Sequence, residues 1–243
     1  RILGMLFPFE REELSLIIAI VAALTMILGV IGALAQNDIR RSLGFLVISG
    51  IGVMMAGLAL GSPAGLSGAI LYAAHSMVVM TALYFAAGIA ARLGGSFELT
   101  AAGGLYAKSA LLAAMTLMLL LSVAGLPPFS GLWPKIMLVK ASLDVGAWWL
   151  AGSILVTGFL TTITVGRIWV LAYWRPLPGA DAGEDAAVAL PMGASAALAG
   201  LVAITVAAGV WPEPLMALAQ DAARGLIDPS AYVLSVFPVE ASQ

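Results

Sequence analysis

The sequence has no cysteine and a single histidine among its 243 residues. Without thiols the chain forms no disulfide framework, no thiolate metal cluster and no covalent haem attachment. A single imidazole also excludes most zinc and iron sites, so we predict that the chain carries no cofactor or metal of its own. The formal net charge is only −2, and the basic surface of a nucleic-acid binder is missing, which excludes nucleic acid as a partner.

The residue sets that catalysis requires are missing too. The sequence offers no paired carboxylates, no serine, histidine and aspartate set, and no phosphate-binding glycine loop. The glycines of "GIGVMMAG" at 50–57 lack the strand context of a nucleotide fingerprint, and we interpret them as helix-packing residues. We therefore do not expect an isolated enzyme.

Charge is scarce as well, since charged residues make up 10% of the chain and hydrophobic residues 62%. The mean hydropathy of +1.06 lies far above that of soluble domains and assigns the chain to a bilayer. The first residue is Arg1, and no signal peptide follows it. We expect an N-terminally incomplete chain.

A spanning helix needs about 20 mostly apolar residues, and six stretches meet this requirement. They cover residues 14–35, 42–60, 65–91, 109–140, 148–174 and 188–211. We therefore predict an all-α integral membrane protein with about six transmembrane helices. Leucines at helical spacing after residue 212 predict an amphipathic helix on the membrane surface within the tail 212–243, with a frayed tail as the alternative.

The distribution of basic residues predicts the orientation, because cytoplasmic loops collect lysine and arginine. The loops on one side hold Arg40, Arg41, Arg92, Lys108 and Arg175, whereas the connecting loops on the other side hold only Lys140. The basic loops, including the loop 175–187, are therefore predicted to be cytoplasmic. The lead-in 1–13 and the C-terminus are predicted to lie outside.

The fourth stretch is too long for one straight span. From residue 109 to 140, a continuous helix would measure about 48 Å, against about 30 Å of hydrocarbon. Helix-breaking residues interrupt it: Gly125, Pro127, Pro128, Gly131 and Pro134. Non-helical backbone at that depth is tolerated only inside protein or beside water, so the sequence predicts a discontinuous helix that lines a polar pathway.

Two lysines follow the predicted break. A charge near the bilayer centre costs about 2.5 to 3.5 kcal/mol on insertion scales, so a lysine placed there needs a cavity or a partner. Lys135 falls in the first turn of the second half-helix, and we predict that it carries protons. The alternative is a lysine that extends to the outer interface, which we favour for Lys140.

His75 lies near the middle of the third span, with Tyr72 one turn earlier. Imidazole exchanges protons near neutral pH, so we predict that His75 relays protons and that Tyr72 shares a hydrogen bond with it. The alternative is a histidine that only joins two helices. Arg167, near the cytoplasmic end of its span, is interpreted as pairing with a loop or reaching the interface. The stripe of Ser153, Thr157, Thr161 and Thr164 is interpreted as bonding between helices.

Three stretches carry a resemblance to a known family: "ALAQNDIRRSLGF", which contains Arg41, "AHSMVVMTALYFAAG" around His75, and "AGLPPFSGLWPK", which ends at Lys135. They resemble the proton-translocating antiporter-like subunits shared by Mrp-type cation/proton antiporters and respiratory complex I. The resemblance extends over about residues 14–211. A lysine rather than a glutamate in "SGLWPKIMLVK" is most similar to the D-type subunit of Mrp antiporters.

The resemblance implies a five-helix transport unit over residues 14–174, a final span, and a proton pathway through His75 and Lys135. It further implies the C-terminal half of a subunit that exchanges Na⁺ for protons in the bacterial cytoplasmic membrane, beside other membrane subunits. One alternative is a proton-pumping membrane subunit of complex I or a related hydrogenase. Another is a transport-inactive scaffold, because Met80 and the apolar stretch 44–52 depart from the polar residues of relatives.

Overall fold

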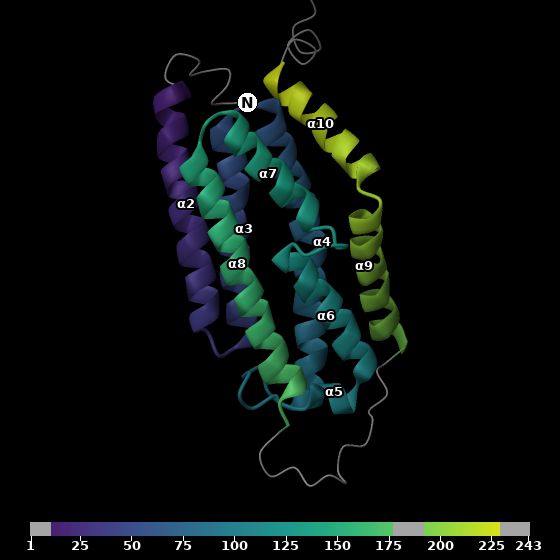
Figure 1. The fold of residues 1–243 in the computed structure, drawn as a ribbon. Coiled ribbons are helices and arrows are strands. Elements are labelled where there is room, and N and C mark those ends of the chain that lie inside the picture. The colour runs from purple at the N-terminus through teal and green to yellow at the C-terminus, as the bar shows by residue number, and fades with distance from the viewer. Residues whose placement is uncertain (1–10, 177–191, 229–243) are drawn as a thin grey trace, which may run out of the picture.

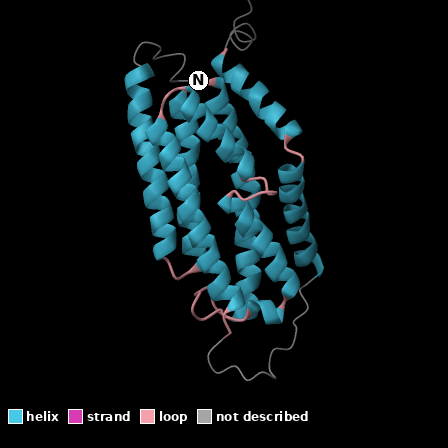
Figure 2. Ribbon diagram, viewed as in Figure 1, coloured by secondary structure: helices cyan, strands magenta, loops and turns pink. Residues whose placement is uncertain are grey.

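A computed structural model describes residues 11–176 and 192–228. The regular elements in these residues are helices, joined by short loops (Figure 2). They are α2 (Arg11–Ala35), α3 (Ile39–Leu60), α4 (Pro63–Gly94), α5 (Leu105–Lys108), α6 (Ala110–Ala124), α7 (Leu132–Asp144), α8 (Trp148–Trp169) with its π-helical extension η1 (Val170–Trp174), α9 (Met192–Val210) and α10 (Glu213–Ile227). Residues 1–10 of the predicted lead-in, most of the loop 175–187 and the tail beyond residue 228 lie outside the described residues, whereas residues 11–13 of the lead-in belong to α2.

Five helices are long and apolar enough to cross a membrane, and α6 is a shorter apolar helix. When α6 and α7 are taken together as one interrupted span, this span and the five long helices match the six predicted stretches. The class of all-α membrane protein is thus confirmed. The third span is longer than predicted, at 63–94, and the predicted start of the last span, 188–191, lies outside the described residues.

Local sequence signals set the helix ends. Asp38 is the N-cap of α3, where its carboxylate accepts hydrogen bonds from the backbone amides of Arg40 and Arg41. Gly61 ends α3 with a φ of 60°, a conformation that glycine adopts without penalty. Ser62 then caps α4, which begins at Pro63. These polar and breaking residues separate apolar segments that would otherwise run together.

The long helices α2, α3 and α8 lie side by side, and α9 packs against α4 and α6 at the opposite edge of the bundle (Figure 1). The glycines at 50–57 allow close packing, as predicted. A Cβ atom on Gly52 would lie 2.6 Å from the backbone nitrogen of Met26, so a larger residue would push α2 and α3 apart. These glycines therefore serve helix packing.

The hydroxyl stripe on α8 does not join helices, and that prediction was wrong. Ser153, Thr157, Thr161 and Thr164 each donate to the backbone carbonyl four residues earlier in α8, at 2.7 to 2.9 Å. The carbonyl of the preceding turn is always within reach of a helical serine or threonine, so it satisfies the hydroxyl without a partner helix.

Arg167 pairs with a loop, as predicted. Its guanidinium donates to the carbonyls of Leu34 and Gln36 at 3.1 and 2.6 Å and to the side chain of Asn37 at 2.6 Å. The last carbonyls of a helix lack partners within it and carry partial negative charge. Arg167 therefore closes the end of α2 and attaches it to α8.

Over residues 213–227 the structure has the predicted amphipathic helix, α10, and not a frayed tail. The buried residues of α10 are Ala219 and Ala223, and the helix packs against α4. Leu215 and Leu218 are exposed, so α10 keeps an apolar face that the described protein does not cover. Such a face suits a helix that lies at a membrane surface.

Candidate functional site

The fourth span is interrupted between α6 and α7, near the middle of the bundle (Figure 2). We call residues 125–131 the break. At its start the Gly125 amide closes α6 by donating to the carbonyls of Leu121 and Ser122, and the Pro127–Pro128 bond is cis. Helix α7 begins at Leu132, so Pro134 lies inside its first turn, where no backbone donor is needed.

The amine of Lys135 reaches back across the break. Its Nζ donates to the carbonyls of Val123 and Ala124 at 2.9 and 2.6 Å. These carbonyls end α6 and carry the partial negative charge of a helix C-terminus, which stabilises a cation. A Cβ atom on Gly125 would lie 2.9 Å from this amine, so the glycine leaves room for the lysine.

The backbone and the amine of Lys135 lie at helix ends of opposite polarity. Its backbone does lie in the first turn of α7, at the positive end of that helix. The side chain, however, places the amine at the C-terminal, partly negative end of α6. The partly buried amine also lines a cavity of about 450 Å³ between α7 and α8. The amine is therefore held by carbonyls and adjoins open space.

His75 is connected to the break through two serine hydroxyls. Its Nδ1 lies 2.8 Å from Oγ of Ser130, and this oxygen lies 3.1 Å from Oγ of Ser122. We call His75, Ser130 and Ser122 the polar chain. Both serines are buried. A hydroxyl both donates and accepts, so each member of this chain can pass on a proton.

The polar chain and the lysine meet at the last turn of α6. Ser122 ends the polar chain, and the next two residues provide the carbonyls that hold Lys135. Gly131 closes the arrangement from the other side, because a Cβ atom there would collide with the carbonyl of Ser122 and lie 3.0 Å from Nε2 of His75. The break thus brings a histidine of α4 and a lysine of α7 to one helix end.

The predicted hydrogen bond between Tyr72 and His75 is not formed. The two rings lie edge to face with centroids 5.9 Å apart, and Nδ1 of the imidazole bonds to Ser130. The Tyr72 hydroxyl lies beside α3, 3.3 Å from where a Cβ atom on Gly50 would be. One helical turn places the rings in contact, but α3 determines where the hydroxyl points.

The two serines were missed from the sequence, although they lie in the short stretches "LSVAG" and "PPFSG" that flank and form the break. Their signal is a hydroxyl on each side of a proline break in an apolar span. Met80 and the apolar stretch 44–52, where this sequence departs from the polar residues of relatives, do not belong to the polar chain. Ser49, within that stretch, donates to the carbonyl of Met26, and Met80 is buried in the apolar core.

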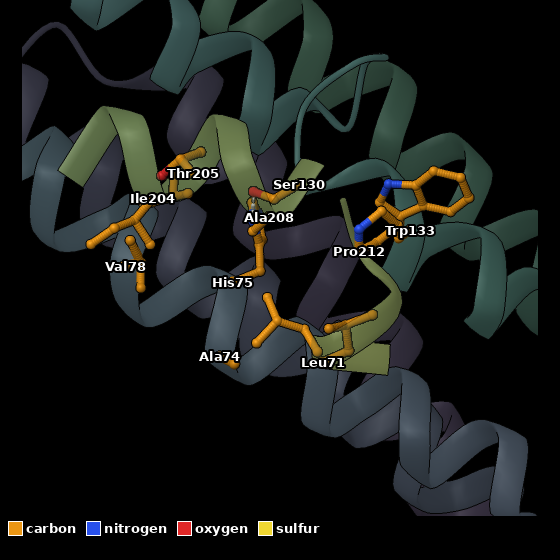
Figure 3. Close-up of a pocket in the computed structure, with 12 residues that line it drawn as sticks. Leu71, Ala74, His75, Val78, Ser130, Trp133, Ile204, Thr205, Ala208 and Pro212 are labelled. Carbon is orange, nitrogen blue, oxygen red and sulfur yellow. Dashed lines mark hydrogen bonds between the residues drawn. The ribbon is translucent and has the colours of Figure 1, made fainter. Parts of the chain in front are cut away.

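A cavity of about 120 Å³ adjoins His75 on the side of α9 (Figure 3). Its lining comes from α4, the break, the first turn of α7, α9 and the start of α10. Apart from His75, Ser130 and Thr205, the lining is almost wholly apolar. The histidine therefore borders a small space of its own, separate from the larger space at Lys135.

The remaining candidates lie away from this site. Lys140 pairs with Asp144 at 3.3 Å, and its side chain is 75% exposed, as suits an interface residue. Arg41 is exposed at the start of α3. Among residues 11–176 and 192–228, no group of three or more histidine, aspartate or glutamate side chains is placed to hold a metal ion.

Replacing His75 with alanine should slow proton transfer without abolishing it. The change removes the first member of the polar chain, while water that enters the enlarged cavity can bridge part of the gap. The initial rate of proton movement in everted vesicles, measured across a pH series, tests this. An unchanged pH profile would show that His75 only joins helices.

A bundle of membrane-length helices around a broken helix, with a lysine at the break, defines a class of helical transport proteins that use discontinuous helices. A family model described as NADH:quinone oxidoreductase/Mrp antiporter, TM, matches residues 1–161. The chain belongs to this family.

Known relatives agree with this assignment. The chain is 32% identical over 239 residues to the D-type Na(+)/H(+) antiporter subunit of Alkalihalophilus pseudofirmus, and the match covers 97% of the chain and 47% of that protein. A chain of the Mrp complex from Dietzia is 27% identical with a TM-score of 0.84, over 93% of this chain and 49% of that one. A chain of respiratory complex I from Thermus thermophilus is 25% identical with a TM-score of 0.78, over 91% of this chain and 46% of that one. The chain thus spans about half the length of these relatives.

Proposed function

We propose that the chain is the C-terminal half of a proton-conducting subunit in a multi-subunit Na⁺/H⁺ antiporter of the Mrp type. The observation that carries the proposal is the position of Lys135. Its amine sits on the last carbonyls of α6, directly after the polar chain that starts at His75. The similarity to the D-type subunits of two Na⁺/H⁺ antiporters supports the same function.

In the proposed mechanism, the residues of the break move a proton along a defined route. Ser130 accepts a proton from the protonated imidazole of His75 as its own hydroxyl proton passes to Ser122. Ser122 releases its own hydroxyl proton in turn, and water carries that proton across the last turn of α6 to the neutral amine of Lys135. The carbonyls of Val123 and Ala124 then hold the protonated amine. Because a protonated amine adds a full charge inside the membrane, loading Lys135 changes the electrostatic field that a neighbouring transport unit experiences.

The proposal includes an environment and partners. The subunit lies in the bacterial cytoplasmic membrane with its basic loops in the cytoplasm, in keeping with the positive-inside rule. Its partners are other membrane subunits of the same antiporter, since the similar solved structures are complexes. The protein acts as a secondary transporter subunit, and the ions it handles are protons and Na⁺.

A second function is favoured by one observation. The chain of complex I from Thermus thermophilus has the same fold over most of this chain. In a respiratory complex the same break and lysine would move protons while a partner carries out the redox chemistry. The subunits that copurify with the chain distinguish the two functions, because only the respiratory complex contains iron-sulfur and flavin proteins.

The test uses everted vesicles that contain the complete complex. After respiration acidifies the vesicle interior, added Na⁺ is expected to collapse the pH gradient only when the complex is present. Quinone-linked proton pumping without any Na⁺ response would instead support the respiratory function. A complex that assembles but shows neither a Na⁺ response nor quinone-linked pumping would support the alternative of a transport-inactive scaffold.

A further inference from the structure

The last spanning helix, α9, lies directly against the backbone of the break. A Cβ atom on Gly209 would collide with the carbonyl oxygen of Pro128 and lie 2.6 Å from the backbone nitrogen of Ser130. Real Cβ atoms do not approach other atoms so closely. A glycine is therefore required where α9 meets the break, and the contact fixes how far the break extends toward α9.

A hydrogen bond fastens the same contact. The indole nitrogen of Trp133, in the first turn of α7, donates to the carbonyl of Gly209 at 2.7 Å. Gly209 lies in the last turn of α9, where carbonyls have no partner within their own helix. A buried carbonyl without a partner is costly inside a membrane. The indole satisfies this carbonyl and couples α9 to the start of α7.

The fastened segment carries the central member of the polar chain. Ser130 must stay within hydrogen-bonding distance of both His75 and Ser122, at 2.8 and 3.1 Å. Its backbone nitrogen is one of the atoms that a Cβ atom on Gly209 would meet. Next to this contact lies the cavity of about 120 Å³ between α4, α9 and the break. Because that side is not filled, the break depends on α9 for its position.

We propose that Trp133 and Gly209 form a clamp through which α9 positions Ser130 between His75 and Ser122. Trp133 is thus a positioning residue for proton transfer. The clamp rests on the proposed function, since it determines how fast the same polar chain conducts. It also assigns a role to α9, which lies beyond the residues 1–161 that the family model matches.

The clamp is tested with Trp133→Phe in the complete complex. Phenylalanine keeps an aromatic ring in place but removes the N–H donor. The initial rate of Na⁺-dependent proton movement should fall about three- to ten-fold, as expected for one lost hydrogen bond. The solvent deuterium isotope effect should rise, because proton transfer through a displaced Ser130 becomes rate-limiting, and the apparent KM for Na⁺ should stay unchanged.

Trp211→Phe is the matched control, because Trp211 follows α9 at the same end and is 68% exposed. It should leave the rate and the isotope effect unchanged. Gly209→Ala, which pushes α9 off the break, should alter both in the same direction as Trp133→Phe. A Trp133→Phe complex with the wild-type rate and isotope effect would overturn the clamp. A lower rate that only follows a smaller amount of assembled complex, with an unchanged isotope effect, would overturn it too.

A second measurement separates failure of the clamp from failure of the proposed function. Hydrogen exchange at the backbone amides of residues 125–131 in the purified complex does not depend on transport. The exchange should become faster in Trp133→Phe and stay unchanged in Trp211→Phe. Wild-type vesicles without any Na⁺ response would refute the antiporter function alone, whereas equal exchange in both variants would refute the clamp alone.

Discussion

Replacing Lys135 with alanine in the complete complex is expected to abolish Na⁺-dependent proton movement in everted vesicles, while the complex still assembles. The change removes the amine that binds the last carbonyls of α6, and the described residues of the break offer no second cation to replace it. Assembly should persist because these carbonyls border a cavity of about 450 Å³, where water can take over their hydrogen bonds.

Lys140→Ala provides the control for the Lys135 variant. Lys140 lies on the same helix, but it is exposed and paired only with Asp144, and exposed ion pairs contribute little. Transport should therefore stay near the wild-type rate. Full exchange in a Lys135→Ala complex that is present in normal amounts would remove Lys135 from the pathway.

Gly131→Ala is expected to produce the second large effect, a loss of most of the assembled complex or of most of its transport. The added methyl group would overlap the carbonyl oxygen of Ser122 and approach Nε2 of His75 to 3.0 Å. Overpacking of this kind costs about 1 to 3 kcal/mol or more. The strain falls on the polar chain itself, because both neighbours belong to it.

The amount of complex after purification and the initial transport rate per complex are the two measurements for this variant. Gly158→Ala is the matched control, because nothing lies within 4 Å of a Cβ atom at that position. Alanine also favours a helix over glycine, so this control should assemble at least as well as the wild type. Equal behaviour of the two variants would contradict the close packing of the break.

Several features could be predicted from the sequence because they depend on local chemistry. Long apolar stretches must span the bilayer, and prolines next to glycines must interrupt a helix wherever they occur. The break between α6 and α7, the place of Lys135 just after it, and the pairing of Arg167 with a loop follow from such rules. Each needs only the residue types of one segment, although the atoms that pair with Arg167 come from α2 and the loop after it.

Other predictions failed because they concern partners from different segments. The hydroxyls on α8 were expected to reach a second helix, but the nearest acceptor was the preceding turn of α8 itself. Tyr72 was expected to bond to His75, which instead found Ser130, 55 residues away in the sequence. Spacing along one helix shows which residues share a face, but the neighbouring helix determines which atoms meet.

The sequence by itself determined that this protein is a helical membrane protein with a broken span and an intramembrane lysine and histidine, because hydropathy and helix breaking act locally. Only the tertiary structure decided where the charge of Lys135 rests and how His75 reaches it. The lysine extends back to the carbonyls of α6, and the histidine connects through Ser130 and Ser122. Both depend on how closely α4, α6, α7 and α9 pack around the break. Gly131 and Gly209 permit this close packing because neither has a side chain.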